Sequence, residues 1–360
     1  MNDRLVDVRI SDGRIREISE RASQGRGDEV IDAHGGVLLP GLHDHHIHLR
    51  ALAASSSSVF VGPSEIADST ELAARLRGAD HDGPNGQWIR AYGYHESVAG
   101  SLDRRALDAM VGTRPVRLQH GSGAAWILNS VALQTIGVEH WDDEGVEREP
   151  DGQPTGVLYR LDHRIAATTR DSATTPNFAS IGQNAAASGI TGFTDADPCR
   201  TQNDLDVIAR AQSTGALPQR IHAMGPDSLT SIEDDRLTIG PVKILLGDFA
   251  LPTIQNLADQ IVGAHLKLRP VAIHCVTRIQ LVVALAAFGE AGSVPGDRIE
   301  HGSIVPVELL RELTRLRLIV VTQPGFIAER GDGYLRDVEP HEIPNLYRCR
   351  SLLRAGIALA

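Results

Sequence analysis

Two histidines separated by a single residue, His46 and His48, are the first candidates for chemistry in this sequence. They lie in the segment Pro40-Gly41-Leu42-His43-Asp44-His45-His46-Ile47-His48-Leu49. In an extended strand, residues i and i+2 point to the same side, so both imidazoles share a face with Asp44. Two imidazoles held close together on a strand suit a divalent transition metal such as zinc. The pair alone is a weak signal, because His-x-His also occurs by chance as two solvated loop histidines.

Two further histidines stand near the ends of apolar runs. His274 lies near the end of Pro270–Cys275, and His301 closes the run Arg298–His301. Each of them alone is more often a core or loop histidine than a ligand. If these runs are parallel strands of a barrel, their carboxyl ends meet at one face, where barrel enzymes place their chemistry. Three separate strand ends then contribute to one predicted metal site.

Lys243 is the fifth candidate, and it lies within the apolar run Gly240–Leu246. A parallel strand is buried on both faces, and a buried lysine is costly unless it is paired or neutral. It could form a buried salt bridge or extend its amine to the surface. Alternatively, burial favours the neutral amine, which can react with CO2 to form a carbamate. Such an anion could bridge two metal ions.

From about residue 38 onward, short apolar runs alternate with stretches of helical pattern. This alternation predicts a parallel sheet with a helix between successive strands. The predicted strands lie at 36–42, 189–194, 220–224, 242–246, 270–275, 298–301, 318–322 and 356–360. Eight of them indicate an α/β fold of the (β/α)8 TIM-like barrel type, with the eighth strand incomplete.

Residues 1–37 and 38–360 are predicted to form separate parts. In the first part, alternating apolar residues, an Asp12-Gly13 turn and a returning strand over Arg14–Ile18 indicate the N-terminal portion of a small β-sandwich. In the barrel, the gap between the first two strands is too long for one helix. We therefore expect an insertion over about residues 55–175, which would cover the catalytic face.

The composition excludes several classes of function. The chain has 360 residues and a formal net charge of −11, which argues against nucleic acid or an anionic membrane as partner. Its first residues contain no apolar h-region of the kind found in signal peptides, and no apolar run is long enough to span a membrane. The spacing of its three cysteines fits neither a zinc ribbon nor a disulfide framework. We expect a cytoplasmic protein that acts on a small molecule, with its oligomeric state, including a homo-oligomer, left open.

Taken together, these motifs resemble the amidohydrolase superfamily, and more narrowly its amidohydrolase-3 (YtcJ-like) branch. The resemblance covers essentially the whole chain. Besides the five candidates, it is carried by the segments Gln87–Gly93, Leu128–Leu133, Asp151–Leu158 and Gly189–Asp195.

The resemblance implies one or two divalent metal ions, with zinc favoured, although iron and manganese also suit the ligands. It implies that His46 and His48 bind the first ion, that His274 and His301 bind the second, and that carboxylated Lys243 bridges them. The implied reaction is hydrolysis of a non-peptide carbon–nitrogen bond by a metal-bound hydroxide.

Two positions depart from the family pattern. Ala124 stands where the family usually has a histidine, and the run Ala355–Ala360 ends without the metal-binding, proton-accepting aspartate of strand eight. We therefore expect a truncated chain whose catalytic base and substrate-binding residues are not assigned. The alternative to an active hydrolase is a truncated, catalytically impaired metal-binding relative. A nucleobase deaminase is less favoured, because no glutamate closely follows His274, and the family segments point away from a phosphoesterase.

Overall fold

The computed structural model describes residues 5–82, 86–169, 177–230, 234–247 and 251–360, and the chain divides into two compact units, Met1–Leu42 and His43–Ala360. In the first unit, strands β1 (Asp7–Ser11) and β2 (Arg14–Ser19) pair antiparallel. Asp12 and Gly13 both have positive φ angles, as a two-residue hairpin turn requires. This confirms the predicted hairpin, while the sandwich around it stays a prediction.

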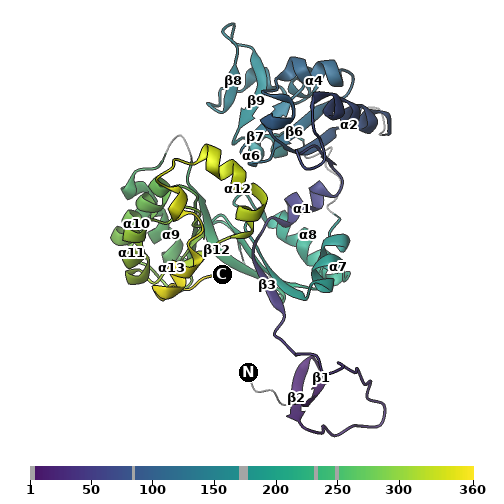
Figure 1. The fold of residues 1–360 in the computed structure, drawn as a ribbon, viewed down its shortest axis with the longest axis vertical. Helices are drawn as coiled ribbons and strands as arrows, with labels where there is room; N and C mark the ends of the chain where they lie inside the picture. Colours follow the sequence, from purple (N-terminus) through teal and green to yellow (C-terminus); the bar gives the residue numbers. More distant parts are fainter. Residues whose placement is uncertain (1–4, 83–85, 170–176, 231–233, 248–250) are drawn as a thin grey trace. The chain divides into compact units, whose positions relative to one another are not determined.

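The second unit is built on a seven-stranded sheet. Its order is β15-β14-β13-β12-β11-β10-β3, and the pairs from β10 to β15 are parallel. The strands are β3 (Leu42–Ile47), β10 (Ile190–Asp195), β11 (Arg220–Gly225), β12 (Leu237–Leu245), β13 (Val271–Cys275), β14 (Arg298–His301) and β15 (Ile319–Val321). Leu359 forms a parallel bridge to Val320, so the last residues take the place of an eighth strand beside β15. The barrel prediction, incomplete at strand eight, is therefore confirmed (Figure 1).

Helices follow the barrel strands, as the alternating pattern predicts. They are α1 (Leu49–Ser55), α7 (Ala179–Ala187), α8 (Gln202–Ser213), α9 (Ile254–Leu266), α10 (Arg278–Ala291), α11 (Leu310–Arg315), α12 (Gly325–Asp337) and α13 (Cys349–Arg354). Short 3-10 turns lie at Val307–Leu309 and Ile343–Asn345. Threonine hydroxyls at Thr201, Thr253 and Thr277 cap α8, α9 and α10, which fixes where these helices begin.

Alternate residues of the strands pack outward against these helices. Val242, Ile244, Ile273, Cys275 and Ile299 all belong to one buried apolar cluster with α9 and α10. Cys275 is thus a core residue, as its position next to His274 in the strand predicts. Because the side chains of a strand alternate, the remaining positions of these strands face the interior of the barrel.

The first barrel strand differs from its prediction. We expected a strand over 36–42 that leads into the histidines, but β3 begins at Leu42 and includes His43 to His46. Residues 36–41 form no strand, and Pro40 and Gly41 explain this, because proline has no N–H for a sheet and glycine weakens a strand. His48 consequently lies just beyond the strand, at the start of α1.

The predicted insertion forms a second sheet of six strands, in the order β4-β5-β6-β7-β9-β8. The first three strands are parallel and the others are antiparallel. The elements are β4 (Val59–Phe60), α2 (Ser69–Asp82), β5 (Ile89–Tyr94), α3 (Glu96–Ala99), α4 (Arg104–Met110), β6 (Val116–His120), β7 (Ala125–Leu128), α5 (Ser130–Ile136), a 3-10 turn (Val138–His140), β8 (Val146–Arg148), β9 (Pro154–Tyr159) and α6 (Asp162–Thr168).

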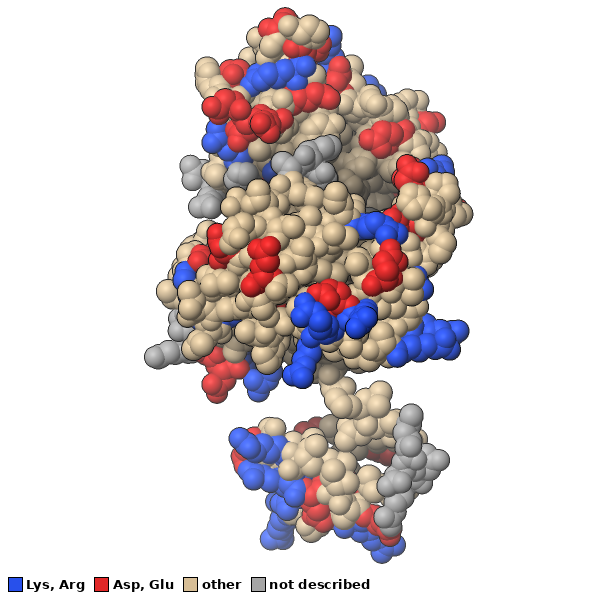
Figure 2. All heavy atoms as spheres, turned by 90° about the vertical axis from the view of Figure 1, so that its left-hand side faces the viewer, with Lys and Arg blue, Asp and Glu red and all other residues tan. Residues whose placement is uncertain are grey.

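The surface carries both signs of charge. On the face shown in Figure 2, lysine and arginine side chains are interspersed with aspartate and glutamate side chains. This mixture accords with the acidic net charge of −11. Among the helices described, none is long and apolar enough to cross a membrane.

Candidate metal centre

The structure brings together the four histidines that the strand-end pattern singles out. The ring centroids of His46 and His48 lie 5.3 Å apart, and those of His46 and His301 lie 4.6 Å apart. His274 joins them from β13, with its ring centroid 4.7 Å from that of His301. Three strands that are distant in the sequence, β3, β13 and β14, therefore meet at one cluster of imidazoles.

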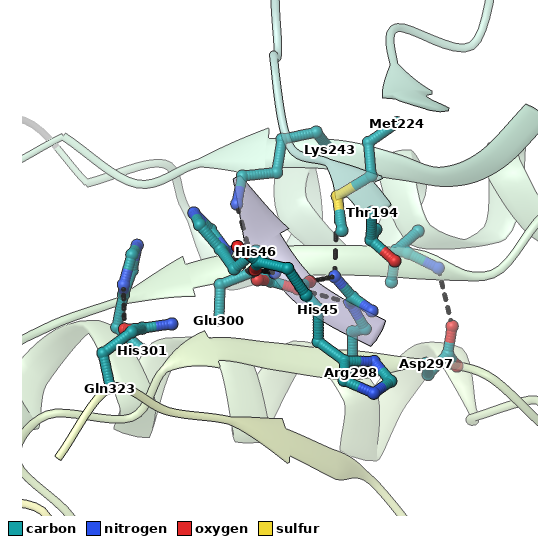
Figure 3. A network of polar contacts seen from close by, with 12 residues as sticks. His45, His46, Thr194, Met224, Lys243, Asp297, Arg298, Glu300, His301 and Gln323 are labelled. Atoms are coloured by element: carbon teal, nitrogen blue, oxygen red, sulfur yellow. Dashed lines mark hydrogen bonds and ion pairs between the residues drawn. The ribbon is translucent and has the colours of Figure 1, made fainter. Parts of the chain in front are cut away.

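Lys243 reaches the same interior from β12. The residue is only 6% exposed, and its Nζ has no hydrogen-bond partner in the described part of the chain. The nearest carboxylate oxygen, Oε2 of Glu300, lies 4.0 Å from Nζ (Figure 3). Burial lowers the pKa of Lys243 to about 8, although Glu300 acts in the opposite direction. The side chain is therefore a buried amine for which the neutral form is accessible.

The environment also favours neutral imidazoles, which are the form that binds metals. Burial, then the charges of His301 and Lys243, lowers the pKa of His274 to about 3. Burial and His46 lower the pKa of His301 to about 4. His48 as a whole residue is exposed, but desolvation of its ring and the charge of His46 lower its pKa to about 4. At neutral pH these three rings offer lone pairs instead of positive charges.

Glu300 is a central member of the cluster; the sequence left open whether it supports the site residues or forms a salt bridge on the helix-facing side of the strand. Its fully buried carboxylate accepts a hydrogen bond from Nδ1 of His46 and another from Nε of Arg298. Burial alone would raise the pKa of Glu300, but the bond from His46 and the cations Lys243 and Arg298 bring it down to about 2. The alternative of a helix-facing salt bridge for Glu300 is thus wrong, since the carboxylate points into the barrel.

Backbone geometry explains why Glu300 and His301 both serve the interior. Consecutive residues of a regular strand face opposite sides. His301, however, has a φ of 68°, in the left-handed region, so the strand ends there and its ring contacts His46 and His274. Histidine is one of the few residue types enriched in this conformation. No strand-parity argument could detect such a local turn.

Asp44 and Asp195, two of the aspartates near the cluster, have other partners. Asp44 accepts from the backbone N–H of His46, at 3.0 Å, and so braces the end of β3. Asp195 forms a buried ion pair with Arg200 and accepts from the backbone N–H of Leu49 at 3.3 Å. Asp195 therefore acts as a hydrogen-bond acceptor at the end of β10. Both groups fix the backbone on either side of His46 and His48.

The insertion contains a smaller histidine pair that the sequence pattern did not single out. The rings of His95 and His120 stack with centroids 5.9 Å apart, at the ends of β5 and β6. Nε2 of His120 lies 3.1 Å from Glu96, and its Nδ1 lies 2.7 Å from the hydroxyl of Ser122. Ala124, where the family pattern has a histidine, follows this turn and accepts a backbone hydrogen bond from Arg160.

The described residues contain no group of three or more His, Cys, Asp or Glu side chains with the arrangement of a metal-binding site. At the cluster, the centroids of neighbouring imidazole rings lie 4.6–5.3 Å apart. The types of donor nevertheless fit a divalent transition metal: largely neutral imidazoles together with a buried amine that has no hydrogen-bond partner in the described part of the chain. His46, His48, His274, His301 and Lys243 are the residues that could hold it.

Comparison with known proteins places the chain among hydrolases. A model described as the amidohydrolase family matches residues 29–360. The N-substituted formamide deformylase of Arthrobacter pascens is 26% identical over 433 residues, covering 100% of this chain and 78% of that protein. The putative amidohydrolase YtcJ of Bacillus subtilis (strain 168) is 24% identical, covering 99% of this chain and 77% of that protein.

Solved structures share the fold. An uncharacterized metal-dependent hydrolase from Pyrococcus horikoshii OT3 superposes with a TM-score of 0.67 at 19% identity, covering 89% of this chain and 70% of that one. Another from Pyrococcus furiosus gives a TM-score of 0.65 at 20% identity, covering 89% of this chain and 72% of that one. At this identity the likeness establishes the barrel architecture.

Proposed function

The chain belongs to the amidohydrolase family, and on that premise we propose that it is a metal-dependent hydrolase that cleaves a non-peptide, amide-type carbon–nitrogen bond in a small molecule. The proposed cofactor is one or two divalent ions, with zinc favoured. In this proposal His46 and His48 hold one ion and His274 and His301 hold the other. Lys243, carboxylated on Nζ, bridges them.

The observation that carries the proposal is the buried amine of Lys243, which has an ion-pair contact with Glu300 but no hydrogen-bond partner in the described part of the chain, beside the cluster of imidazoles. A buried amine without a hydrogen-bond partner is costly, so its presence calls for a role. Reaction of the neutral amine with CO2 forms an N–C bond and releases one proton, which converts the orphan donor into an anionic ligand. The lowered pKa of Lys243, about 8, supports this reaction near neutral pH.

The protein's own side chains prepare the site for a cation. His274 and His301 present neutral rings, since burial keeps their pKa values at about 3 and 4. Glu300 fixes the ring of His46 through Nδ1. A bound divalent ion would polarise the scissile carbonyl group and increase the acidity of a water molecule. The described residues do not assign the general base, which stays open.

The relative that acts on N-substituted formamides suggests the first substrates to try. We propose an N-substituted formamide or another small amide, whose hydrolysis releases an amine. A panel of such compounds with different N-substituents, assayed by amine release, tests the reaction. Turnover that requires added zinc supports the proposal. One metal equivalent or more without hydrolysis of any amide would favour the alternative of a catalytically impaired metal-binding relative.

The metal site itself is tested by metal analysis of purified protein. We expect wild type to contain at least one equivalent of a divalent transition metal, and His46→Ala and Lys243→Ala to lose most of it. His140→Ala is the matched control, because the His140 side chain is 83% exposed and lies in the insertion. Metal content that stays unchanged in both site variants would refute the proposed site.

A further inference from the structure

His46 and His301 contact each other, and each ring also has a side-chain oxygen within hydrogen-bond distance of its Nδ1. Glu300 contacts Nδ1 of His46, and Oε1 of Gln323 lies 2.9 Å from Nδ1 of His301 (Figure 3). We infer that Glu300 and Gln323 are positioning residues, which keep the proton of each imidazole on Nδ1 and leave Nε2 bare to bind the ion. This inference rests on the proposed function, because it assigns supports to ligands of the same ion.

The carboxylate of Glu300 settles which atom donates in its contact with His46. An ionised carboxylate can only accept hydrogen bonds. Glu300 is fully buried and already faces the Arg298 guanidinium through its other oxygen, so the ionised form is stabilised. In the neutral ring of His46 the proton therefore sits on Nδ1 and the lone pair on Nε2.

Arg298 extends this support to the strand that carries His46. It is 7% exposed and lies two residues before Glu300, on the same side of β14. Its Nε donates to Glu300, while one of its terminal nitrogens donates to the backbone carbonyl of His45 at 2.9 Å. The ring of His46 and the backbone beside it are therefore held by the same pair of β14 side chains, which sets the ring orientation relative to the strand.

Gln323 supports His301 from just beyond β15. Its amide oxygen faces Nδ1 of His301, whereas its amide nitrogen is buried without a hydrogen-bond partner in the described part of the chain. A buried unsatisfied donor calls for an explanation, and an acceptor that arrives with a ligand provides one. Together with the orphan amine of Lys243, this places two unsatisfied donors at the cluster.

General metal-site chemistry agrees with this arrangement. A metal-binding histidine usually donates its other ring N–H to a carboxylate, a carbonyl or water, which fixes the tautomer and makes the ligand more basic. Loss of such a partner typically weakens metal affinity or activity by roughly 10- to 100-fold. His46 and His301 each have a partner of this type.

The test compares metal affinities of variants that remove or keep each acceptor. Metal-free protein is titrated with zinc in competition with a chromogenic chelator, and the absorption spectrum of the Co²⁺-loaded protein reports the coordination. We expect Glu300→Gln and Gln323→Leu to bind zinc roughly 10- to 100-fold more weakly than wild type, with altered Co²⁺ spectra. Gln323→Glu keeps an acceptor at the same place and should retain affinity close to wild type.

Asp297→Asn is the matched control for loss of a buried carboxylate. Asp297 lies directly before β14, is fully buried, and accepts from the backbone N–H of Val271 at 2.8 Å. It pairs with His265 and makes no contact with the four site histidines among the interactions described. We expect this variant to lower thermal stability but to leave zinc affinity and the Co²⁺ spectrum unchanged.

The outcomes separate this inference from the proposed function. Wild-type affinity and spectra in both Glu300→Gln and Gln323→Leu, with metal lost in His46→Ala, would overturn the inference alone. Metal content that stays unchanged in both His46→Ala and Lys243→Ala would overturn the proposed function. Equal weakening in Asp297→Asn and Glu300→Gln would show a general loss of structure and also refute the positioning role. If Glu300→Gln does not fold, the Gln323→Leu and Gln323→Glu pair decides.

Discussion

The imidazole of His274 shows how far a barrel interior can shift one residue from its behaviour in water. Burial and neighbouring cations lower its pKa to about 3, and His301 follows at about 4. In the unfolded chain both pKa values return to about 6.5. Between about pH 4 and pH 6.5 the unfolded state therefore binds more protons. The free energy of unfolding consequently rises with pH in this window, and the protein becomes less stable as the pH falls through it.

We predict that metal-free protein, unfolded with urea at a series of pH values, becomes steadily less stable from pH 6.5 to pH 4. Each such histidine contributes a slope of up to about 1.4 kcal/mol per pH unit. His274→Asn should flatten the profile by up to this amount, while His140→Asn, at an exposed position, should not. Profiles of wild type and His274→Asn that run parallel would contradict the assigned cause.

For individual residues, the sequence identified the candidate metal ligands but not the side chains that position them. Lys243, His274 and His301 could be identified because each interrupts or closes an apolar run, and the structure brings them together with His46. Their role as ligands stays a prediction. Gln323 could not be recognised, and the two alternatives for Glu300 could not be decided, because both roles depend on the left-handed turn at His301 and on contacts between strands far apart in the sequence.

Between β3 and β10, one glycine makes room for a histidine. A Cβ added at Gly192 would come closer than 3.0 Å to Nδ1 of His43, whose Nε2 bonds the hydroxyl of Thr194 at 2.8 Å. The ring cannot simply swing away without losing this bond. Gly192 therefore allows β3 to lie against β10 with His43 between them, and the same strand positions His46.

We predict that Gly192→Ala lowers the free energy of unfolding by roughly 1–3 kcal/mol, as overpacking typically does. The double variant His43→Ala/Gly192→Ala should recover part of this loss. Gly263→Ala is the control: Gly263 lies in α9 with nothing within 4 Å of the added Cβ, so this change should stabilise the helix by about 0.5–1 kcal/mol. Denaturant unfolding of wild type and the three variants measures the free energies of unfolding. An unchanged value for Gly192→Ala would disprove the close contact between Gly192 and His43.

The strands of the barrel could be predicted where the sequence pattern is uninterrupted. The prediction for β14 matches its bounds, and that for β13 differs by one residue. The start of β12 was missed, because Gly240 and Pro241 looked like a boundary, whereas the strand continues through an irregular register there. The strands of the insertion were not predicted individually, since β4 has two residues and β8 three, too few to display a period.

For the whole molecule, an ion that binds only the folded chain would act as a stabiliser by mass action. At a free ion concentration 100 times the dissociation constant, the free energy of unfolding increases by about 2.7 kcal/mol. We predict that zinc raises the thermal unfolding midpoint of wild type, that a chelator reverses this, and that His46→Ala responds to neither. If the two units Met1–Leu42 and His43–Ala360 unfold in separate transitions, only that of the second should shift. A zinc effect of the same size in His46→Ala would show binding elsewhere.

The left-handed backbone at His301 also restricts how this centre can diversify. Apart from glycine, asparagine, aspartate and histidine are the residue types enriched in this conformation. Of the side chains that bind metals, aspartate and asparagine therefore fit the backbone at position 301 better than cysteine or glutamate do, so the imidazole exchanges more readily for an oxygen donor. Oxygen donors suit manganese or magnesium, whereas thiolates suit softer ions. Substitutions at position 301 that change the metal preference are therefore expected to favour harder ions, because the backbone angle limits which ligand side chains fit there.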